Sequence, residues 1–562
     1  MTNFLRPLAA AVALALALSG CASRSTAPVE INLVALNDFH GNLDSSKFRY
    51  TSVLDKTQHT IEAGGVDTLA AALQAWRQED RELLLIGAGD LVGGSPAMSS
   101  MWADEPSIAA LNLLGLRASS LGNHEFDQGR LELLRQQEGG CVSTRPQQAC
   151  QFEPFFHGAK FSYLAANVLD RASGKPFMPA YRIETVRGVK IGLIGAVLKD
   201  TASVVLASSI AGLEFIDEAD AVNRVLPELR EQGVGVFVLL VHQGGHSADY
   251  FDQPDCANLG GPVVDIAKRL DPAISVVVSG HSHTGYTCRV DGRLVTQAEM
   301  GGHVLSRIKL SVDPVSNSVR EASARNVVMT QGTYPPDLVM EEYLKSVRER
   351  SAAVLSKPVA RLAVASVTRE RNDAGESALG NLVADSALAA TRSAGAQIAF
   401  MNNGGIRKDL DAGADLVSTV GQCQMVLPFA NTLVTMSLSG AQIRALLEQQ
   451  WVQDKADSRG LLQVSDGFAY RWDARRAQGQ RVLPGSVRLN GAPLEDAKVY
   501  RVAVNNFLAE GGDSFPMFNQ GGDRVNTGIR DGDALTDYLS QRDRAGVPAG
   551  RAAPAGRIQR VQ

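Results

Sequence analysis

Histidine, aspartate and asparagine side chains follow a series of short apolar segments in this chain. The sequence has only 9 His among 562 residues, so their positions are informative. If the apolar segments are strands of α/β sheets, the polar residues after them meet at the carboxyl ends of the strands, which is the usual ligand crevice. The residues expected there are Asp38, His40, Asp90, Asn123, His124, His242, His281 and His283.

Mixed imidazole and carboxylate side chains of this kind are typical metal ligands. They suit Zn, Mn, Fe or Ni rather than an all-oxygen Ca site. In Asp38-x-His40 and His281-x-His283, a spacing of two returns both side chains to one side of an extended turn. The set is too large for one tetrahedral ion, but it fits two ions that share a bridging Asp and leave positions open for water and substrate. The sequence therefore predicts two divalent metal ions, Zn, Mn or similar.

The elements that must position these residues alternate between strands and helices. An amphipathic helix is predicted over Asp67–Gln78, between two apolar runs. Runs rich in β-branched residues predict a sheet that is buried on both faces, and hence an α/β fold. The predicted strands are Ile31–Leu36, Glu82–Gly87, Val189–Ala196, Gly235–Val241 and Ile274–Ser279.

Length and composition predict more than one domain. A chain of 562 residues exceeds one ordinary domain, and 45% apolar with 20% charged residues fits a packed protein. We expect a first domain over 30–330, a linker over 331–356 with a helix at Leu338–Leu355, a second domain over 357–545 and a tail over 546–562. The tail is rich in Ala, Gly, Pro and Arg, so we expect it to lie at the surface or to be partly disordered.

The second domain is also predicted to mix helices and strands. Its apolar patterns are separated by loops rich in Gly and Asn. The predicted helices are Leu379–Ala394 and Ser439–Gln450, and the predicted strands are Gln397–Met401 and Val499–Asn505.

The first twenty residues have the pattern of a targeting signal. The apolar run from Leu8 to Leu18 is too short to span a bilayer but fits the core of a signal peptide. The segment 18–21, Leu-Ser-Gly-Cys, resembles the lipobox of bacterial lipoproteins. By that resemblance residues 1–20 are removed, Cys21 carries lipid and residues 21–29 form a tether. Ala22 then favours the outer membrane, facing the periplasm. An ordinary secretory signal is the alternative.

Charge and cysteine content add two expectations. The net charge is −5, from 55 Lys and Arg against 60 Asp and Glu, which excludes a global positive field for duplex nucleic acid. Export predicts an oxidising compartment, where disulfides are stable. Four cysteines allow three pairings, and we favour Cys141 with Cys150 and Cys256 with Cys288. Cys423 is left over and is expected to be buried.

At this point the chain resembles a known family. Asp38-x-His40, Gly89-Asp90, the GNHEFD segment at 122–127 and Gly280-His281-x-His283 are similar to the motifs of the calcineurin-like metallophosphoesterases, in the form typical of the 5′-nucleotidase branch. The resemblance implies an N-terminal four-layer α/β/β/α domain, a linker helix and a C-terminal α/β substrate-binding domain.

The resemblance also implies a role for each metal-site residue. One metal would be held by Asp38, His40, Asp90 and His283, and the other by Asp90, Asn123, His242 and His281. His124 would face the scissile phosphate as a catalytic residue, with Asp127 orienting it. Some bacterial relatives carry Gln where this chain has His283, which affects metal preference without removing a ligand.

The second domain resembles the same family independently. The segments 402–407 (NNGGIR), 426–429 (VLPF) and 506–513 (NFLAEGGD) are similar to three family loops. In relatives, two Phe sandwich the base, Arg binds phosphate and Asp binds the ribose. The second phosphate Arg is expected at Arg371, although its spacing departs from the family pattern. The implied substrate-binding residues are Asn402, Arg407, Phe429, Phe507, Asp513 and Arg371.

The function predicted from these residues is two-metal hydrolysis of nucleotide phosphoesters. A 5′-nucleotidase that releases nucleoside and phosphate in the periplasm fits the motif set. Hydrolysis of UDP-sugars or NAD, or of 2′,3′-cyclic nucleotides, remains open within the same family. A non-catalytic nucleotide-binding lipoprotein is the alternative from another class, and the complete ligand set with His124 and Asp127 disfavours it. The oligomeric state does not follow from the sequence.

Overall fold

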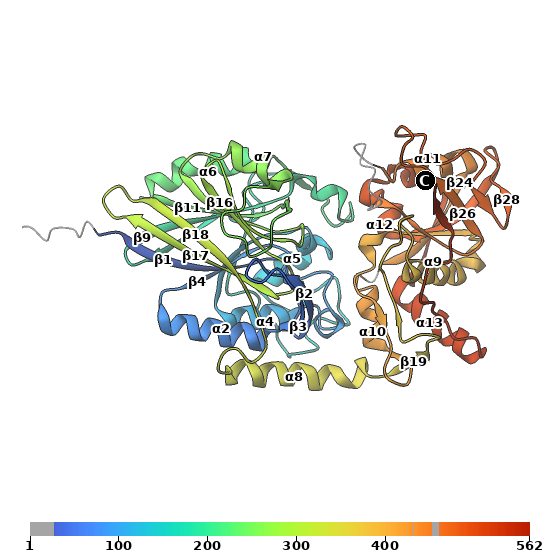
Figure 1. Cartoon of the computed structure of the whole chain (residues 1–562), viewed down its shortest axis with the longest axis horizontal. Coiled ribbons are helices and arrows are strands. Elements are labelled where there is room, and N and C mark those ends of the chain that lie inside the picture. The colour runs from blue at the N-terminus through green and yellow to red at the C-terminus, as the bar shows by residue number, and fades with distance from the viewer. Residues whose placement is uncertain (1–26, 430, 452–459, 562) are drawn as a thin grey trace, which may run out of the picture.

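The computed structural model describes residues 27–429, 431–451 and 460–561. The predicted signal peptide, Met1–Gly20, and the predicted lipidation site, Cys21, lie outside the described residues. The described chain forms two domains, and one long helix runs along the first and reaches the second at its end (Figure 1).

Two six-stranded sheets form the centre of the first domain. The first sheet has the order β18 (Ser318–Val328), β17 (Val304–Asp313), β1 (Val29–Leu36), β4 (Leu84–Ala88), β5 (Leu116–Ser120) and β6 (Ser162–Leu164). The second has the order β15 (Gly285–Val290), β16 (Arg293–Ala298), β14 (Ile274–Ser279), β11 (Val236–His242), β9 (Val189–Val197) and β8 (Tyr181–Val186).

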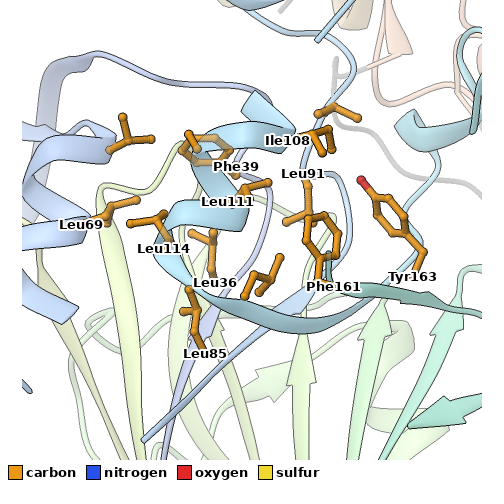
Figure 2. Close-up of a cluster of buried hydrophobic side chains, with 14 of the residues drawn as sticks. Leu36, Phe39, Leu69, Leu85, Leu91, Ile108, Leu111, Leu114, Phe161 and Tyr163 are labelled. Carbon is orange, nitrogen blue, oxygen red and sulfur yellow. The ribbon is translucent and has the colours of Figure 1, made fainter. Parts of the chain in front are cut away.

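The two sheets pack face to face, and helices cover both outer faces. Leu33, Leu193 and Val238 belong to the apolar cluster between the sheets. Helices α2 (Val66–Glu79) and α4 (Glu105–Leu114) cover the first sheet, and part of their apolar cluster is shown in Figure 2. Helices α6 (Glu218–Glu231) and α7 (Pro262–Arg269) cover the second sheet. The predicted α/β/β/α layers are therefore present.

The linker helix α8 spans Leu338–Leu355, as the sequence predicts. The side chain of Asp337 caps it by accepting a hydrogen bond from the backbone N–H of Met340 at 3.0 Å. Leu344 and Val347 are buried in the apolar cluster of the first domain. The helix also contacts helix α10 (Val420–Val426) of the second domain, so it packs on both domains.

The second domain contains a five-stranded sheet and a four-stranded sheet. Helices α9 (Ala378–Thr391), α11 (Gly440–Glu448) and α13 (Asp531–Arg544) pack around them (Figure 1). The larger sheet has the order β25 (Gln463–Val464), β21 (Ile398–Met401), β29 (Val499–Asn505), β24 (Thr432–Ser439) and β30 (Gly522–Arg530). The smaller has the order β28 (Ala492–Pro493), β27 (Arg488–Leu489), β26 (Phe468–Trp472) and β31 (Ile558–Arg560).

The prediction of a surface or partly disordered tail over 546–562 is wrong for its last part. Strand β31 lies parallel to β26, and Ile558 is buried in the apolar core. The carboxylate of Glu376 accepts hydrogen bonds from the backbone N–H groups of Arg557 at 3.0 Å and Ile558 at 3.3 Å. The tail is therefore built into the second domain.

Both favoured disulfides are present, Cys141 with Cys150 and Cys256 with Cys288. Cys423 is a buried free thiol, as expected. Within the described ranges, no helix has the length and apolar character needed to cross a membrane.

Candidate functional site

The predicted metal ligands leave the carboxyl ends of strands from both sheets. Asp38 and His40 follow β1, Asp90 follows β4, His242 ends β11, and the His281 segment follows β14. The sequence predicts extended turns here, and the structure differs. Asp38, His40, Asp90, His281 and His283 all have positive φ, between 46° and 72°. Non-glycine residues adopt this left-handed conformation only where the surroundings impose it, as is common in functional sites.

The ligand atoms form two groups that share one carboxylate. In the first, the candidate ligand atoms of Asp38, His40, Asp90 and His283 all lie within 4.8 Å of one another. In the second, those of Asp90, His242 and His281 satisfy the same limit. Asn123 lies one residue before His124, whose backbone N–H donates to Asp90 at 2.9 Å. The Oδ1 atom of Asn123 is buried and has no hydrogen-bond partner within the described chain.

The hydrogen bonds at the imidazoles fit a bound cation. Nδ1 of His40 lies 2.8 Å from the carbonyl oxygen of Gly93, so this nitrogen carries the proton. The lone pair of His40 Nε2 then faces Nε2 of His283 at 3.1 Å. Two lone pairs at this distance repel each other unless a proton or a cation compensates them.

The second group has the same arrangement. Nδ1 of His242 lies 2.7 Å from the carbonyl oxygen of Ala88, which leaves Nε2 as the ligand atom. This Nε2 lies 3.0 Å from an oxygen of the Asp90 carboxylate. Burial lowers the pKa of His242, but the carboxylates of Asp90 and Asp38 outweigh burial and raise the pKa to about 10. A site that attracts a proton so strongly also attracts a divalent cation.

The other titratable ligands are in suitable protonation states. Burial raises the pKa of Asp90, but His242 and His124 outweigh it and hold the pKa well below its usual range. Burial, together with the charge of His242, lowers the pKa of His281 to about 4. At neutral pH Asp90 is therefore ionised and His281 is neutral, as metal ligands must be.

Two buried side chains that the sequence analysis did not single out hold the ligand loops. The carboxylate of Glu125 accepts hydrogen bonds from the backbone N–H groups of Gly122 at 2.6 Å, Asp90 at 3.0 Å and Leu91 at 2.7 Å. Burial and the nearby Asp90 raise the pKa of Glu125 to about 7. The amide of Asn37 donates to Asp38 at 2.7 Å. The signal for both residues was their position next to predicted ligands.

His124 and Asp127 form the predicted pair beside the metal site. Nδ1 of His124 lies 2.8 Å from Oδ2 of Asp127, across the single turn η1 (His124–Phe126). Burial lowers the pKa of His124, but the carboxylates of Asp127 and Asp90 outweigh burial and raise the pKa. His124 can therefore hold a proton on Nε2 while Nδ1–H donates to Asp127.

A cavity of about 340 Å³ lies between the two domains, within the size range of small-molecule sites. The first domain contributes His124, Asp127 and His281 to its lining, and the second contributes all but one of the predicted substrate residues. These are Asn402, Arg407, Phe429, Phe507 and Asp513. The amide of Asn402 donates to the Asp513 carboxylate at 2.7 Å, so these two side chains support each other.

The exception is Arg371, which does not line this cavity. Arg369, two residues earlier, donates to the carbonyl oxygen of Ile406 at 3.2 Å, next to Arg407. Burial lowers the pKa of Arg407, and the charge of Arg369 adds to this effect. Arg369 therefore lies near Arg407 without lining the cavity itself, and Arg371 as the second phosphate Arg stays a prediction.

Comparison with known proteins agrees with this geometry. A model of the calcineurin-like phosphoesterase family matches residues 31–285, and a model of the 5′-nucleotidase C-terminal domain matches residues 355–520. The chain belongs to the calcineurin-like phosphoesterases that carry a 5′-nucleotidase C-terminal domain. Membership of this family makes the protein a metal-dependent phosphoester hydrolase.

Relatives of this family in bacteria resemble the chain over most of its length. It is 30% identical to the endonuclease YhcR of Bacillus subtilis, over 93% of this chain but only 41% of that protein. It is 27% identical to a 5′-nucleotidase of Vibrio cholerae, over 96% of each chain. The crystal structure of a 5′-nucleotidase precursor from Thermus thermophilus superimposes with a TM-score of 0.75 at 28% identity, covering 95% of this chain and 100% of that one.

Proposed function

We propose that this protein is a 5′-nucleotidase that hydrolyses nucleoside 5′-monophosphates to nucleoside and phosphate with two divalent metal ions. One observation carries the proposal. His124 and Asp127 of the first domain line the same cavity as Phe429 and Phe507 of the second. A phosphate-transfer centre and two aromatic faces suited to a base therefore meet in one space.

The residues of the two ligand groups fit the two ions. Asp38, His40, Asp90 and His283 would hold one ion, and Asp90, Asn123, His242 and His281 would hold the other. Two divalent ions held by these residues would polarise phosphoryl oxygens and lower the pKa of water.

The side chains next to the ions handle the substrate and the proton. Asp127 accepts the Nδ1–H of His124 and so leaves Nε2–H free to donate to the leaving oxygen. The carboxylates of Asp127 and Asp90 raise the pKa of His124 and so favour the protonated form. Arg407 is a cation that lines the same cavity and can bind phosphate with two parallel hydrogen bonds.

The second domain supplies groups that suit a nucleoside. Phe429 and Phe507 offer aromatic faces, on which any base can stack. The Asp513 carboxylate can accept hydrogen bonds from ribose hydroxyls, and Asn402 beside it can bind the base. Such stacking tolerates different bases, so we expect a broad base preference.

We further propose that the protein is exported and anchored to the outer membrane through a lipid on Cys21, facing the periplasm. The support is the sequence at 18–21 and the two disulfides, which suit an oxidising compartment. Release of Cys21→Ala as soluble protein, with the parent in the membrane fraction, would support lipidation. Membrane association of both would contradict it.

The decisive experiment measures phosphate release by the purified mature protein after EDTA dialysis and addition of Mn or Zn. The substrates are AMP, UMP, UDP-glucose, NAD, a 2′,3′-cyclic nucleotide and p-nitrophenyl phosphate. A short oligonucleotide joins them because one relative is named an endonuclease. We expect the highest kcat/KM with the monophosphates. A preference for any other substrate would keep the metal chemistry and overturn the 5′-nucleotidase assignment.

His124→Ala separates an enzyme from a nucleotide-binding lipoprotein. Removal of a proton donor that acts in the transition state is expected to lower kcat by about 10²- to 10⁴-fold. Equilibrium binding of AMP should change much less. Full phosphate release by the variant would exclude the role assigned to His124.

A further inference from the structure

The ring of Phe429 packs on the candidate catalytic histidine. The ring centroids of Phe429 and His124 lie 5.4 Å apart, and the two planes are inclined by only 14°. The guanidinium carbon of Arg407 lies 5.7 Å from the centroid of the same Phe429 ring. Within the described part of the chain, no ring contact joins Phe429 to Phe507, although both line the cavity.

Phe429 belongs to the second domain, but its ring contacts residues of the first. It follows α10, and its ring lies against the loop after β4. A Cβ atom placed on Gly94 would lie only 3.2 Å from Cε1 of Phe429 and 3.7 Å from Nδ1 of His40. The side-chain-free backbone at Gly94 therefore gives the ring room beside a predicted metal ligand.

In this position the ring covers groups that a phosphate needs. A parallel stack at this distance shields one face of the His124 imidazole. The contact with Arg407 similarly occupies a cation that would otherwise face the phosphate. A phosphoester that is to lie against this face of His124 and against the side of Arg407 that faces the ring must first displace Phe429.

The identity of the substrate then decides how easily the ring is displaced. A nucleotide offers Phe429 a new stacking partner, its base, in the same cavity. A small phosphoester without a base offers Phe429 no new stacking partner. Displacing the ring then costs the contacts of Phe429 with His124 and Arg407 without compensation. The cost of losing one aromatic stack corresponds to a bias of about 3- to 10-fold.

We propose that Phe429 is a plug that keeps phosphoesters without a base away from His124 and Arg407 until a nucleobase draws the ring aside. This inference rests on the proposed function, because it takes His124 and Arg407 as the groups that meet the phosphate. It gives Phe429 a role in substrate selection that Phe507 does not share, since Phe507 has no ring contact with His124 within the described residues.

The experiment compares Phe429→Ala, Phe429→Leu and the matched control Phe507→Ala with the parent. We would measure kcat/KM for glycerol 1-phosphate, which has no aromatic ring, and for AMP, both with Mn present. Thermal unfolding verifies that each variant is folded. Calorimetric binding of inorganic phosphate adds a readout that needs no turnover. We expect Phe429→Ala to raise kcat/KM for glycerol 1-phosphate and the affinity for phosphate by about 3- to 10-fold. Phe429→Leu, which keeps bulk but cannot stack, should fall in between.

The control separates the plug from the base platform. Both Phe→Ala variants should raise KM for AMP, but only Phe429→Ala should gain in kcat/KM for glycerol 1-phosphate and in affinity for phosphate. The plug is overturned if folded Phe429→Ala shows no gain with either ligand, whatever happens to AMP. Failure of the proposed function would give a different result. The parent would show no preference for AMP, and Phe507→Ala would have the same KM for AMP as the parent.

Discussion

The carboxylate of Glu125 accepts a hydrogen bond from the backbone N–H of Asp90 at 3.0 Å. The same buried side chain also accepts from the N–H of Gly122 at 2.6 Å, just before Asn123. One carboxylate thus holds two loops that carry metal ligands, without itself belonging to either ligand group. Side chains that orient the ligands in this way also influence metal affinity, although they do not touch the metal.

Glu125→Ala should therefore weaken metal binding although every ligand remains. We expect a loss of about 10- to 100-fold in Mn affinity, with much of the activity recovered at high Mn concentration. Mn titration of the EDTA-dialysed protein, by calorimetry and by activity, measures both. Glu125→Gln keeps one acceptor oxygen and should be affected less. Parental Mn affinity in Glu125→Ala would show that the loops hold their positions without this carboxylate.

Arg369 and Arg371 provide a matched pair of candidates for a second cation that binds phosphate beside Arg407. Arg369 donates to Ile406 and lies close enough to Arg407 to affect its pKa. We expect Arg369→Ala to raise KM for AMP by about 5-fold or more, as expected for the loss of a hydrogen bond to a charged group. Arg371→Ala, on the same segment, should change KM much less. A larger effect for Arg371 in steady-state kinetics would contradict this expectation and support Arg371 as the second phosphate Arg.

The metal site could be predicted because its ligands sit where strands end, and strand ends are visible in the sequence. The apolar runs before Asp38, Asp90 and His281 locate the carboxyl edges of the sheets. The left-handed backbone at these residues was not predictable, since it depends on contacts between loops that are distant in the chain. The role of Glu125 depends on such contacts too.

The end of the chain shows the opposite case. Its Ala, Gly, Pro and Arg content is typical of a loose tail, yet β31 pairs with β26. The partner that fixes it is the buried Glu376 carboxylate, 182 residues away from Ile558. The composition of a segment shows that it has few apolar side chains. It does not show that the backbone of the segment can hydrogen-bond to a side chain far away in the sequence.

Arg145 should contribute strongly to stability because it is a mostly buried cation that pairs with two buried carboxylates. It lies in the loop closed by Cys141 and Cys150, and it pairs with Asp104 at 3.1 Å and Glu132 at 3.2 Å. Arg145→Ala leaves both carboxylates short of a partner, so we expect a loss of about 3 kcal/mol in unfolding free energy.

The control for Arg145 is an exposed pair of the same type. Arg348 and Asp44 are in contact but are both about half exposed, so Arg348→Ala should cost less than about 1 kcal/mol. Urea unfolding of the three proteins compares the two losses. Equal losses for the two variants would show that burial does not strengthen the Arg145 interactions.

Asp531 should make stability depend on pH in a direction opposite to that of most carboxylates. It is buried at the start of α13, and burial raises its pKa to about 7 despite a hydrogen bond from the N–H of Gly532. In the unfolded chain the pKa of Asp is about 3.9. The folded state therefore holds a proton that the unfolded state releases. This contribution is complete below about pH 4 and is lost as the pH rises through about 7, with a slope of at most about 1.4 kcal/mol per pH unit.

Asp531→Asn removes this titration while keeping an acceptor oxygen for Gly532. We expect the parent to lose stability relative to Asp531→Asn between about pH 5 and pH 7, as measured by urea unfolding at each pH. Asp533→Asn, on the same turn but exposed, should follow the parent at every pH and so corrects for the loss of a charge near the start of α13. If the free-energy difference between the parent and Asp531→Asn does not change over this range, Asp531 is ionised in the folded protein, because only a proton held at this carboxylate makes the difference depend on pH.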